Sequence, residues 1–198
     1  MKPITSGRAS EIFDLGDGRI LRRGGDPERE ARVMRNVAAH GYPVPDVLEV
    51  QADALIIERL AGPTMLEELL REPSLIRSRA ALLADLQRRL HEIEAEDGTR
   101  QLHMDLHPEN VILSGDGPVV VDWTNARGGE PALDVAMTWV ICATSGGDLG
   151  RLFVRDFLPH FELDEIRHTL PAAAELRLGD PNVTEDKKHA VRRLLARG

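Results

Sequence analysis

The segment LHMDLHPENVILSGDGPVVVDW, residues 102–123, is dense in side chains that can do chemistry. It contains two histidines, two aspartates and an asparagine, set among apolar residues and one glycine-containing turn: His103, Asp105, His107, Asn110 and Asp122. Three interpretations compete for such a group. It can be a metal site, a site of phosphoryl transfer, or an ordinary loop.

The interpretation as a metal site rests on three residues that stand at every second position. If the segment were a strand, His103, Asp105 and His107 would share one face, and imidazole with carboxylate suits zinc or iron. Pro108 disfavours a regular strand continuing through this point. No further histidine, cysteine or aspartate stands at a usual ligand spacing. A metal-dependent hydrolase using these three residues is therefore the less favoured alternative.

An ordinary loop explains each residue singly, with aspartates that cap turns and histidines satisfied in the core. It does not explain the spacing of Asp105 and Asn110, or the hairpin that delivers Asp122 to the end of an apolar strand. Phosphoryl transfer explains both. It needs a carboxylate that accepts the proton of an attacking hydroxyl, and oxygen ligands for magnesium on the nucleotide phosphates.

The order HMDLHPEN and then VVVDW resembles the catalytic loop and metal-binding loop of the protein-kinase-like fold. The Asp-Trp pair, followed by DWTNARGGEPALDVA, is similar to the aminoglycoside phosphotransferase and choline-kinase branch. Members of that branch phosphorylate hydroxyl groups of small molecules. The resemblance extends from about Ile4 to Ala143, and it is most specific in the catalytic segment.

The resemblance implies a role for each residue of the segment. Asp105 matches the catalytic base, and Asn110 and Asp122 match the ligands of Mg²⁺. His103 matches a structural brace. His107 is expected to orient the loop rather than to carry protons.

Further positions follow from the same resemblance. Asp134, in PALDVA, resembles the buried aspartate that holds the backbone of the catalytic loop. Glu30, with Glu28 as the fallback, resembles the helix glutamate that pairs with a strand lysine. In LIIERLAG, the backbone of Glu58 and Leu60 resembles the hinge that binds adenine.

The chain departs from the family pattern at three places. Arg22 stands where the strand lysine is expected, and arginine keeps the charge with a different reach. The phosphate-covering turn, TSGRASEI, has one glycine, so Ser6 and Gly7 are only candidate phosphate contacts. Met104 replaces a glycine that is common in this branch, and we expect it to pack against the core.

The elements that must position these residues begin with a small sheet. Residues 4–23 read as strands that turn at Gly7 and at LGDG, followed by a helix with Asp26 as its N-cap and Gly41 after its end. DVLEV and ALIIERL add two strands, and AGP at 61–63 is the expected link. We predict a bilobal α+β fold, with a β-rich N-lobe over residues 1–60 and a mainly helical C-lobe over 61–198.

The C-lobe pattern is helical on both sides of the catalytic segment. Thr64 and Glu67 form a capping box, and Ser74 is the expected cap of a longer helix. ALDVAMTWVICA reads as a buried helix that ends at Gly146. At least two more helices are expected, the last capped by Thr184.

Composition narrows the functional classes. The formal charge is −8, with 15 basic and 18 acidic residues in the first 100 positions and 10 and 15 in the rest, so nucleic acid is disfavoured as a partner. Cys142, the single cysteine, is expected to be an inert buried thiol. No apolar run approaches the ~20 residues of a membrane span, and no signal peptide opens the sequence. We expect a cytoplasmic monomer or homodimer.

These observations predict an ATP- or GTP-dependent phosphotransferase that uses Mg²⁺ and acts on a hydroxyl of a small metabolite or antibiotic. A kinase-like nucleotide-binding protein with weak or no catalysis is the first alternative. Arg22 and the sparse glycine turn favour that alternative, whereas Asp105, Asn110 and Asp122 argue against it. The sequence does not name the acceptor, and it does not distinguish ATP from GTP.

Overall fold

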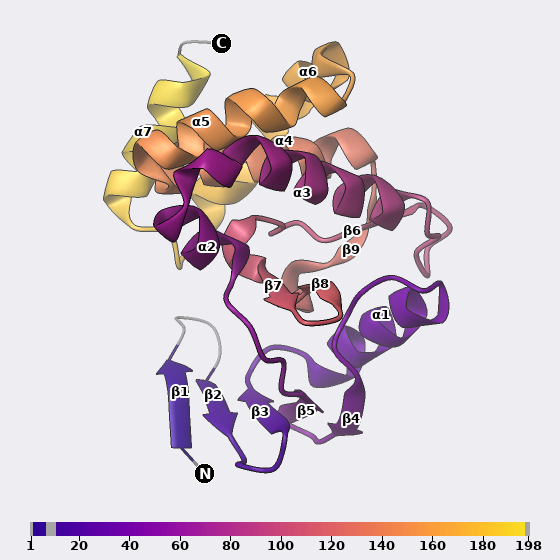
Figure 1. Ribbon diagram of the computed structural model, residues 1–198. Helices are drawn as coiled ribbons and strands as arrows, with labels where there is room; N and C mark the ends of the chain where they lie inside the picture. Colours follow the sequence, from indigo (N-terminus) through magenta and orange to yellow (C-terminus); the bar gives the residue numbers. More distant parts are fainter. Residues whose placement is uncertain (1, 7–10, 197–198) are drawn as a thin grey trace.

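The computed structural model describes the backbone of residues 2–6 and both backbone and side chains of residues 11–196. The first part of the chain forms one antiparallel sheet in the order β1-β2-β3-β5-β4 (Figure 1). Its strands are β1 Lys2–Ser6, β2 Glu11–Asp14, β3 Arg19–Arg23, β4 Val47–Val50 and β5 Ala54–Glu58. The strands predicted within residues 4–23, DVLEV and ALIIERL are therefore confirmed, whereas the turn predicted at Gly7 lies outside the described residues.

One helix, α1 Pro27–Ala39, packs on this sheet beside β4 and β5. Asp26 caps it by accepting the Arg29 N–H, and Pro27 occupies its first position, as the sequence predicts. Gly41 follows its end with φ +72°, a conformation that glycine adopts without strain.

The link from the sheet to the remainder is held tightly. Gly62 has φ +137°, and a Cβ atom at this position would collide with the Leu113 carbonyl oxygen. The Pro63 carbonyl then accepts the Leu113 N–H at 2.9 Å. The link therefore packs directly against the predicted hairpin around SGDG, which lies within the catalytic segment.

The second part of the chain is mainly helical and lies above the hairpins in Figure 1. Its helices are α2 Met65–Arg71, α3 Ile76–His91, α4 Pro131–Ser145, α5 Gly147–Phe157, α6 Leu163–Gly179 and α7 Glu185–Leu195. The capping box of Thr64 and Glu67 is confirmed, and Gly146 ends α4 as predicted. Among the described residues, no helix is long and apolar enough to cross a membrane.

One predicted cap is wrong. Ser74 does not cap α3, because Pro73 starts a separate 3₁₀ turn that includes Ser74, and α3 begins only at Ile76. The Ser74 hydroxyl donates to Glu72 instead. At the last helix, Thr184 does occupy the N-cap position of α7, although its side chain makes no capping bond.

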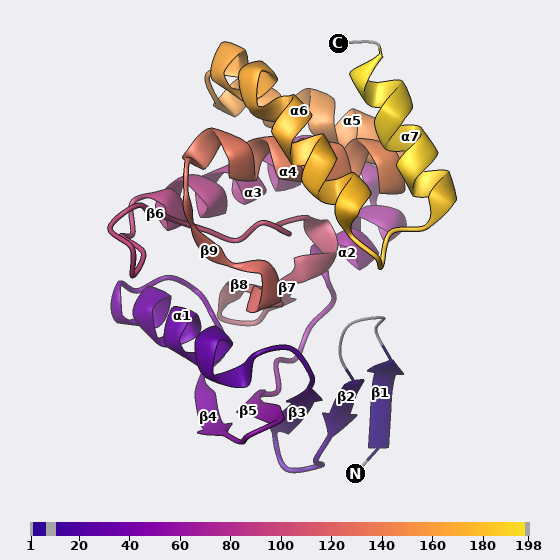
Figure 2. The ribbon, with the colours of Figure 1, turned by 180° about the vertical axis from the view of Figure 1, so that it is seen from behind.

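Two short hairpin-like pairs lie between the sheet and the helices (Figure 2). The predicted hairpin around SGDG is β7 Val111–Ser114 with β8 Gly117–Val120. A second pair, β6 Arg100–Leu102 with β9 Arg127–Gly129, was not predicted, because each strand has only three residues and its partner is distant in sequence. This second pair joins the two ends of the catalytic segment.

The main core runs from α1 through the hairpins into α3, α4 and α5. Trp123 is among its largest fully buried side chains, and its indole N–H donates to the Val120 carbonyl at 3.0 Å. The Trp123 ring packs on the His103 ring at 4.7 Å between centroids. The residue after Asp122 therefore anchors the metal-loop segment in the core.

Candidate active site

The start of the catalytic loop is held by a buried carboxylate. Asp134, on α4, accepts the backbone N–H groups of His103 at 3.2 Å and Met104 at 2.6 Å. The backbone of Met104 has φ +66°, a left-handed conformation that glycine adopts more readily. Met104 is also buried in the core, as predicted. The contacts of Asp134 hold the loop in this strained turn and match the brace role predicted for it.

Asp134 is itself held from α3. His91 Nε2 lies 2.9 Å from Asp134 Oδ2, and both residues are buried. Burial alone would raise the pKa of Asp134, but the hydrogen bond and charge of His91, followed by His103 and Gln87, hold it below its usual value. Asp134 therefore stays ionised as an acceptor.

His103 is a fully buried brace rather than an available ligand. Its Nδ1 accepts the Asp105 N–H at 3.3 Å, and its Nε2 lies 3.1 Å from the Val121 carbonyl oxygen. These two bonds require a neutral ring with the proton on Nε2. Burial, the largest effect, lowers the pKa of His103, in agreement with the neutral form.

Asn110 and Asp105 are joined directly. Asn110 Nδ2 donates to the Asp105 carbonyl oxygen at 2.8 Å and to Asp105 Oδ2 at 3.3 Å. Because the amide nitrogen is committed in this way, Asn110 Oδ1 is the atom left to meet a cation. The Asn110 carbonyl accepts the Val121 N–H at 3.0 Å, which ties this loop to the strand end just before Asp122.

Asp122 follows β8 with φ +65° and lines the same cavity as Asp105. Although its burial acts in the opposite direction, the Arg22 guanidinium and the Thr124 hydroxyl hold the pKa of Asp122 below its usual value. Asp122 is thus an ionised carboxylate next to the catalytic loop. Hard oxygen atoms of this kind suit Mg²⁺.

Arg22 is the cation that the small sheet contributes to this region. It donates to Glu30 and to the Thr124 hydroxyl, and its Nη2 lies 2.9 Å from Asp122 Oδ1. Arg22 and Glu30 are both buried. Burial, only partly offset by Arg22, raises the pKa of Glu30. The predicted pairing of Arg22 with Glu30 is present, whereas the contact with Asp122 was not predicted.

The Asp105 carboxyl has an environment that disfavours its charge. Burial, followed by the negative charge of Asp122, raises its pKa to about 7, against the opposing effects of Arg177 and Asn110. A carboxyl with a pKa near neutrality is suited to accept a proton from a hydroxyl group. This value belongs to the protein without a bound cation.

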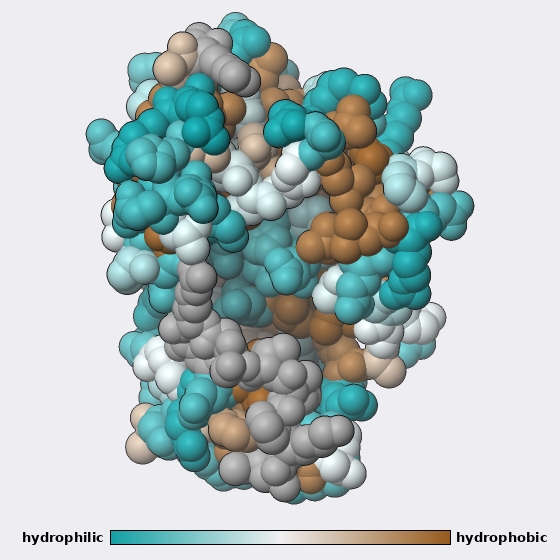
Figure 3. Space-filling model, turned by 90° about the vertical axis from the view of Figure 1, so that its left-hand side faces the viewer, coloured by the Kyte–Doolittle hydropathy of each residue, from teal (hydrophilic) through white to brown (hydrophobic). Residues whose placement is uncertain are grey.

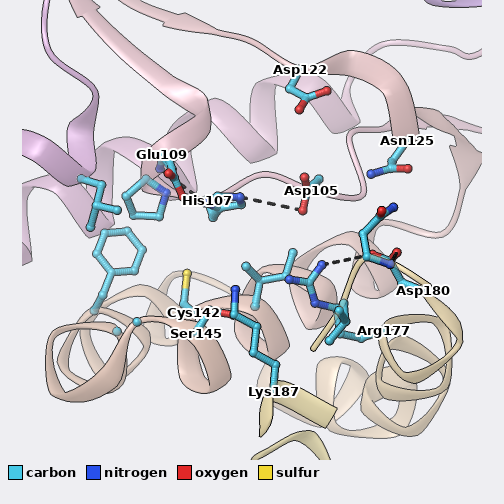
Figure 4. A pocket seen from close by; sticks show the side chains of 18 of the residues that line it. Asp105, His107, Glu109, Asp122, Asn125, Cys142, Ser145, Arg177, Asp180 and Lys187 are labelled. Carbon is cyan, nitrogen blue, oxygen red and sulfur yellow. Dashed lines mark hydrogen bonds and ion pairs between the residues drawn. The ribbon is translucent and has the colours of Figure 1, made fainter. Parts of the chain in front are cut away.

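His107 is a neighbour of the Asp105 carboxyl group. Its Nε2 is 3.8 Å from Asp105 Oδ1, and its Nδ1 accepts the Glu109 N–H at 3.4 Å (Figure 4). Burial lowers the pKa of His107 to about 4, so the ring is neutral at pH 7. His107 caps the 3₁₀ turn Pro108–Asn110, which is the orienting role expected of it.

The arrangement does not favour a site made of His103, Asp105 and His107. Both ring nitrogens of His103 are already bonded to backbone groups. Within residues 11–196, no three histidine, cysteine, aspartate or glutamate side chains are placed together to hold a metal ion. The hydrolase alternative therefore lacks the geometry it needs.

Asp105 opens into a cavity of about 390 Å³ on the helical side of the molecule. The cavity combines an apolar wall from α2, α4 and α5 with charged groups from α6 and α7 (Figure 4). The charged and polar residues that were not predicted here are Glu109, Thr124, Asn125, Ser145, Arg177, Asp180, Asn182 and Lys187. Glu109, Thr124 and Asn125 lie within the quoted catalytic and metal-binding stretches but had no predicted role, whereas no motif marked the residues from α4, α6 and α7, which folding brings to the cavity from separate segments.

The other predicted residues lie on the small-sheet side. Ser6 ends β1, but its side chain and Gly7 are outside the described residues. Glu58 ends β5, and its N–H donates to the Asp46 carbonyl at 3.0 Å. The Leu60 N–H makes no hydrogen bond within the described part of the chain. The Glu58 carbonyl and the Leu60 N–H therefore remain candidate contacts for a nucleotide base.

A second arginine links α1 to the loop after Asp122. Arg29 donates to the Thr124 carbonyl at 3.1 Å and also to the Ala126 carbonyl. Arg29 was not predicted as a site residue, because a helix arginine three positions after a capping aspartate is ordinarily solvated. Its contacts fix the metal-loop segment against the small sheet.

Comparison with known proteins begins with sequence. Residues 80–169 match the model of the phosphotransferase enzyme family. A thiamine kinase of Salmonella paratyphi B is 44% identical over 39 residues, and a thiamine kinase of Salmonella newport matches equally. That stretch is 20% of this chain and spans 14% of the length of the thiamine kinases.

Solved structures extend the similarity to the whole fold. A thermostable mutant of aminoglycoside phosphotransferase APH(4)-Ia has a TM-score of 0.76 at 16% identity, covering 98% of this chain and 92% of its own. The same enzyme is known in a ternary complex with AMP-PNP and hygromycin B. Plasmodium vivax ethanolamine kinase has a TM-score of 0.69 at 11% identity, covering 97% of this chain and 81% of its own.

These matches agree with the resemblance seen in the catalytic segment. The family match covers the helices and hairpins around Asp105, and the structural match also includes the small sheet. The chain has the protein-kinase-like fold, and its residues 80–169 are similar to the phosphotransferase enzyme family.

Proposed function

We propose that the protein transfers the γ-phosphoryl group of ATP or GTP to a hydroxyl group of a small molecule. The observation that carries this proposal is the arrangement of Asp105, Asn110 and Asp122. Asn110 donates to Asp105, and Asp105 and Asp122 line one cavity. A proton acceptor and a carboxylate ligand at one cavity, with an amide side chain bonded to the acceptor, are groups that phosphoryl transfer requires.

Asp105 is the proposed base. Its carboxylate would orient the acceptor hydroxyl and accept its proton as the oxygen attacks the γ-phosphorus. The bond from that phosphorus to the bridging oxygen breaks, and the nucleoside diphosphate leaves. Because burial and, after it, the charge of Asp122 raise the pKa of Asp105 to about 7, the carboxylate is basic enough to accept this proton.

The proposed Mg²⁺ site consists of Asn110 Oδ1 and the Asp122 carboxylate. The residues fit this cation, since both atoms are hard oxygens and the amide nitrogen of Asn110 is already committed to Asp105. Bound there with a nucleotide, Mg²⁺ would neutralise phosphate charge. Asp122 is held ionised for this role by Arg22 and Thr124.

The small sheet is the proposed nucleotide lobe. Residues 1–60 would cover the nucleotide, with the Glu58 carbonyl and the Leu60 N–H facing the base, and residues 61–198 would supply the chemistry. Arg22, oriented by Glu30, is proposed to steady the phosphates. Ser6 and Gly7 stay proposals for phosphate contacts. The cytoplasmic location and the monomeric or homodimeric state also stay predictions.

The test is a γ-phosphate transfer assay with ATP, Mg²⁺ and a panel of hydroxyl-bearing small molecules, run beside calorimetry of nucleotide binding. Asp105→Asn is expected to abolish transfer and to leave nucleotide binding largely intact. Asp116→Asn, in the exposed turn between β7 and β8, is the matched control and is expected to change neither.

The outcomes distinguish a phosphotransferase from a nucleotide-binding protein without catalysis. Wild-type protein that binds the nucleotide but shows no turnover with any acceptor or with water would support the non-catalytic alternative. Equal transfer rates in the wild type and Asp105→Asn would contradict the assignment of the base.

A further inference from the structure

The cavity next to Asp105 contains two cations that the proposed chemistry does not use. Arg177 comes from the last turn of α6, and Lys187 comes from the first turn of α7 (Figure 4). Both side chains line the cavity and point into it. They lie on its helical wall, whereas Asp122 lies on the opposite side of Asp105 (Figure 4).

Lys187 has no ion-pair partner among the described residues. The chain has three lysines among 25 basic residues, and one of them points into this cavity. Within residues 11–196, no carboxylate forms an ion pair with Lys187. Its neighbour Lys188 does form one, with Glu185 at 3.5 Å. A half-buried ammonium group without a carboxylate has unused capacity for an anion.

Arg177 is only partly satisfied. Its Nη1 lies 3.6 Å from Asp180 Oδ2, which is an ion pair but too long for a good hydrogen bond. Its Nε is buried and has no hydrogen-bond partner among the described residues. An orphaned buried donor costs free energy unless a ligand satisfies it. Arg177 therefore also has donor capacity directed at the cavity.

The acidic residues of the cavity do not cancel these two cations. Asp105 and Asp122 lie at the proposed reaction centre, and Glu109 is exposed on the loop beside it. Among the described residues of the lining, Asp180 is the acidic one that pairs with Arg177, and it forms no ion pair with Lys187. A polycationic acceptor would have to place its charge against Arg177 and Lys187.

The remaining wall is apolar. It is formed by side chains of α2, α4 and α5: Leu66, Leu69, Ile141, Leu149 and Phe153. A hollow between the two parts of the molecule, where hydrophilic and hydrophobic side chains meet, is visible in Figure 3. The cavity volume of about 390 Å³ is near the lower end of the range for small-molecule sites, roughly 300–1,000 Å³.

We propose that the acceptor is a small amphipathic alcohol that carries an anionic group. Its hydroxyl would lie at Asp105, its anionic group, a carboxylate or a phosphate, at Arg177 and Lys187, and its hydrocarbon part on the apolar wall. This inference rests on the proposed phosphotransferase function, since it names the acceptor class for the same site.

The first experiment compares acceptors of one length that differ in a single group: hydroxyhexanoate, hexanediol monophosphate, hydroxyhexanamide and aminohexanol. Transfer from ATP is measured for each, and binding to the nucleotide-free protein is measured by calorimetry. The anionic pair is expected to be used with at least about tenfold higher kcat/KM than the amide and the amine. The order within the anionic pair distinguishes carboxylate from phosphate.

Substitutions then test whether Lys187 and Arg177 cause the preference for anionic acceptors. Lys187→Met is expected to raise KM for the anionic acceptors by about ten- to a hundredfold, with kcat and nucleotide affinity little changed. Arg177→Gln is expected to act in the same direction. Lys187→Glu is expected to shift the preference from the anionic to the amine acceptor. The matched controls are Lys188→Met, one position along α7, and Arg167→Gln, on the exposed part of α6.

The outcomes also separate this inference from the function on which it rests. Phosphate transfer that prefers the amine or the amide, with Lys187→Met and Arg177→Gln equal to their controls, would overturn the acceptor class and leave the phosphotransferase intact. Absence of any transfer, together with unimpaired binding of the anionic alcohols that Lys187→Met weakens, would overturn the proposed function and support the anion site.

Discussion

At the scale of single residues, the raised pKa of Asp105 connects its surroundings with its proposed chemistry. Burial and the charge of Asp122 raise its pKa to about 7, although Asn110 and Arg177 act against this. The same environment that would suit the carboxyl to the proposed role of base makes its ionised form unfavourable in the folded protein. Function and stability therefore oppose each other at this side chain.

The titration of Asp105 is directly measurable. We expect the metal-free protein to show a carboxyl group titrating with a pKa of about 7 by carbon-13 NMR, lost in Asp105→Asn. Asp122→Asn removes the neighbouring charge and should lower that pKa, while burial still holds it above the ordinary value. An Asp105 signal that titrates at the ordinary value for aspartate would contradict the burial described here.

The sign of the effect on stability follows from linkage. The folded pKa is raised, so the contribution of Asp105 to stability is fully present below its unfolded pKa and is lost as the pH rises through about 7. Asp105→Asn should therefore gain stability over the wild type between about pH 4 and about pH 8 in urea unfolding. A difference independent of pH would be inconsistent with the raised pKa.

Arg22 is the second residue whose environment makes a clear prediction. Arg22→Ala leaves Glu30 buried without its cation, which we expect to cost about 3–5 kcal/mol in unfolding free energy. If Arg22 also contacts the phosphates, transfer should slow by about 10²–10³. Arg22→Lys keeps one charge and should retain part of both properties.

The neighbouring Arg23 is the matched control for Arg22. Arg23 is more exposed, with ion pairs to Glu11 and Asp53 on the outer side of the sheet. We expect Arg23→Ala to change unfolding by less than about 1 kcal/mol. If Arg23→Ala slows transfer and Arg22→Ala does not, the strand position proposed for the phosphate contact is wrong.

At the scale of elements, helix α4 is the support of the catalytic loop. It carries Asp134, whose carboxylate holds the backbone of His103 and Met104, and Thr138, whose hydroxyl donates to the Leu106 carbonyl at 2.8 Å. Helix α3 adds His91 behind Asp134. Two helices therefore hold the loop in a conformation in which the left-handed backbone of Met104 is strained.

Replacement of Asp134 tests this support. Asp134→Asn places an amide group where three donors converge, so we expect a loss of about 3–5 kcal/mol in unfolding free energy at neutral pH. Because the pKa of Asp134 is lowered in the fold, its contribution is present above the unfolded pKa and is lost as the pH falls into the acid range. The difference between variant and wild type should accordingly shrink in acid.

For the whole molecule, the important feature is that the small sheet and the helical part meet at the loop after Asp122. Arg22 reaches it from β3, and Arg29 reaches it from α1. Elsewhere, α1 contacts the helical part through Asn36, which donates to the Glu94 carbonyl at 3.0 Å. A ligand bound by Asp122 would therefore lie at the junction of the two parts, next to the contacts that join them.

Binding at that junction should stabilise the whole chain. With Mg²⁺ and a non-hydrolysable ATP analogue at about a hundredfold excess over Kd, we expect a gain of about 2.7 kcal/mol, or roughly 5–11 °C in Tm for a chain of this size. Asn110→Ala and Asp122→Asn should remove most of the gain, and Asp116→Asn should keep it. Zinc that stabilises the protein equally without nucleotide would contradict an oxygen site for Mg²⁺.

Features that depend on neighbouring residues could be predicted from the sequence. The strands and caps of the small sheet, the hairpin of β7 and β8, and the segment from His103 to Asp122 all lie within short stretches of chain. Turn chemistry and side-chain periodicity act over such distances, so residue order determines them. The wrong cap at Ser74 marks the boundary of this reasoning, since Pro73 permitted a separate turn.

Only the tertiary structure decided which distant side chains meet. Arg22 and Asp122 are 100 positions apart, and Arg177 and Lys187 reach the Asp105 cavity from helices late in the chain. The order of residues carries no local signal for such contacts, because they depend on how whole helices and strands pack. The composition of residues 103–122 therefore determined the type of chemistry, whereas the packing of α6 and α7 decided what surrounds the acceptor.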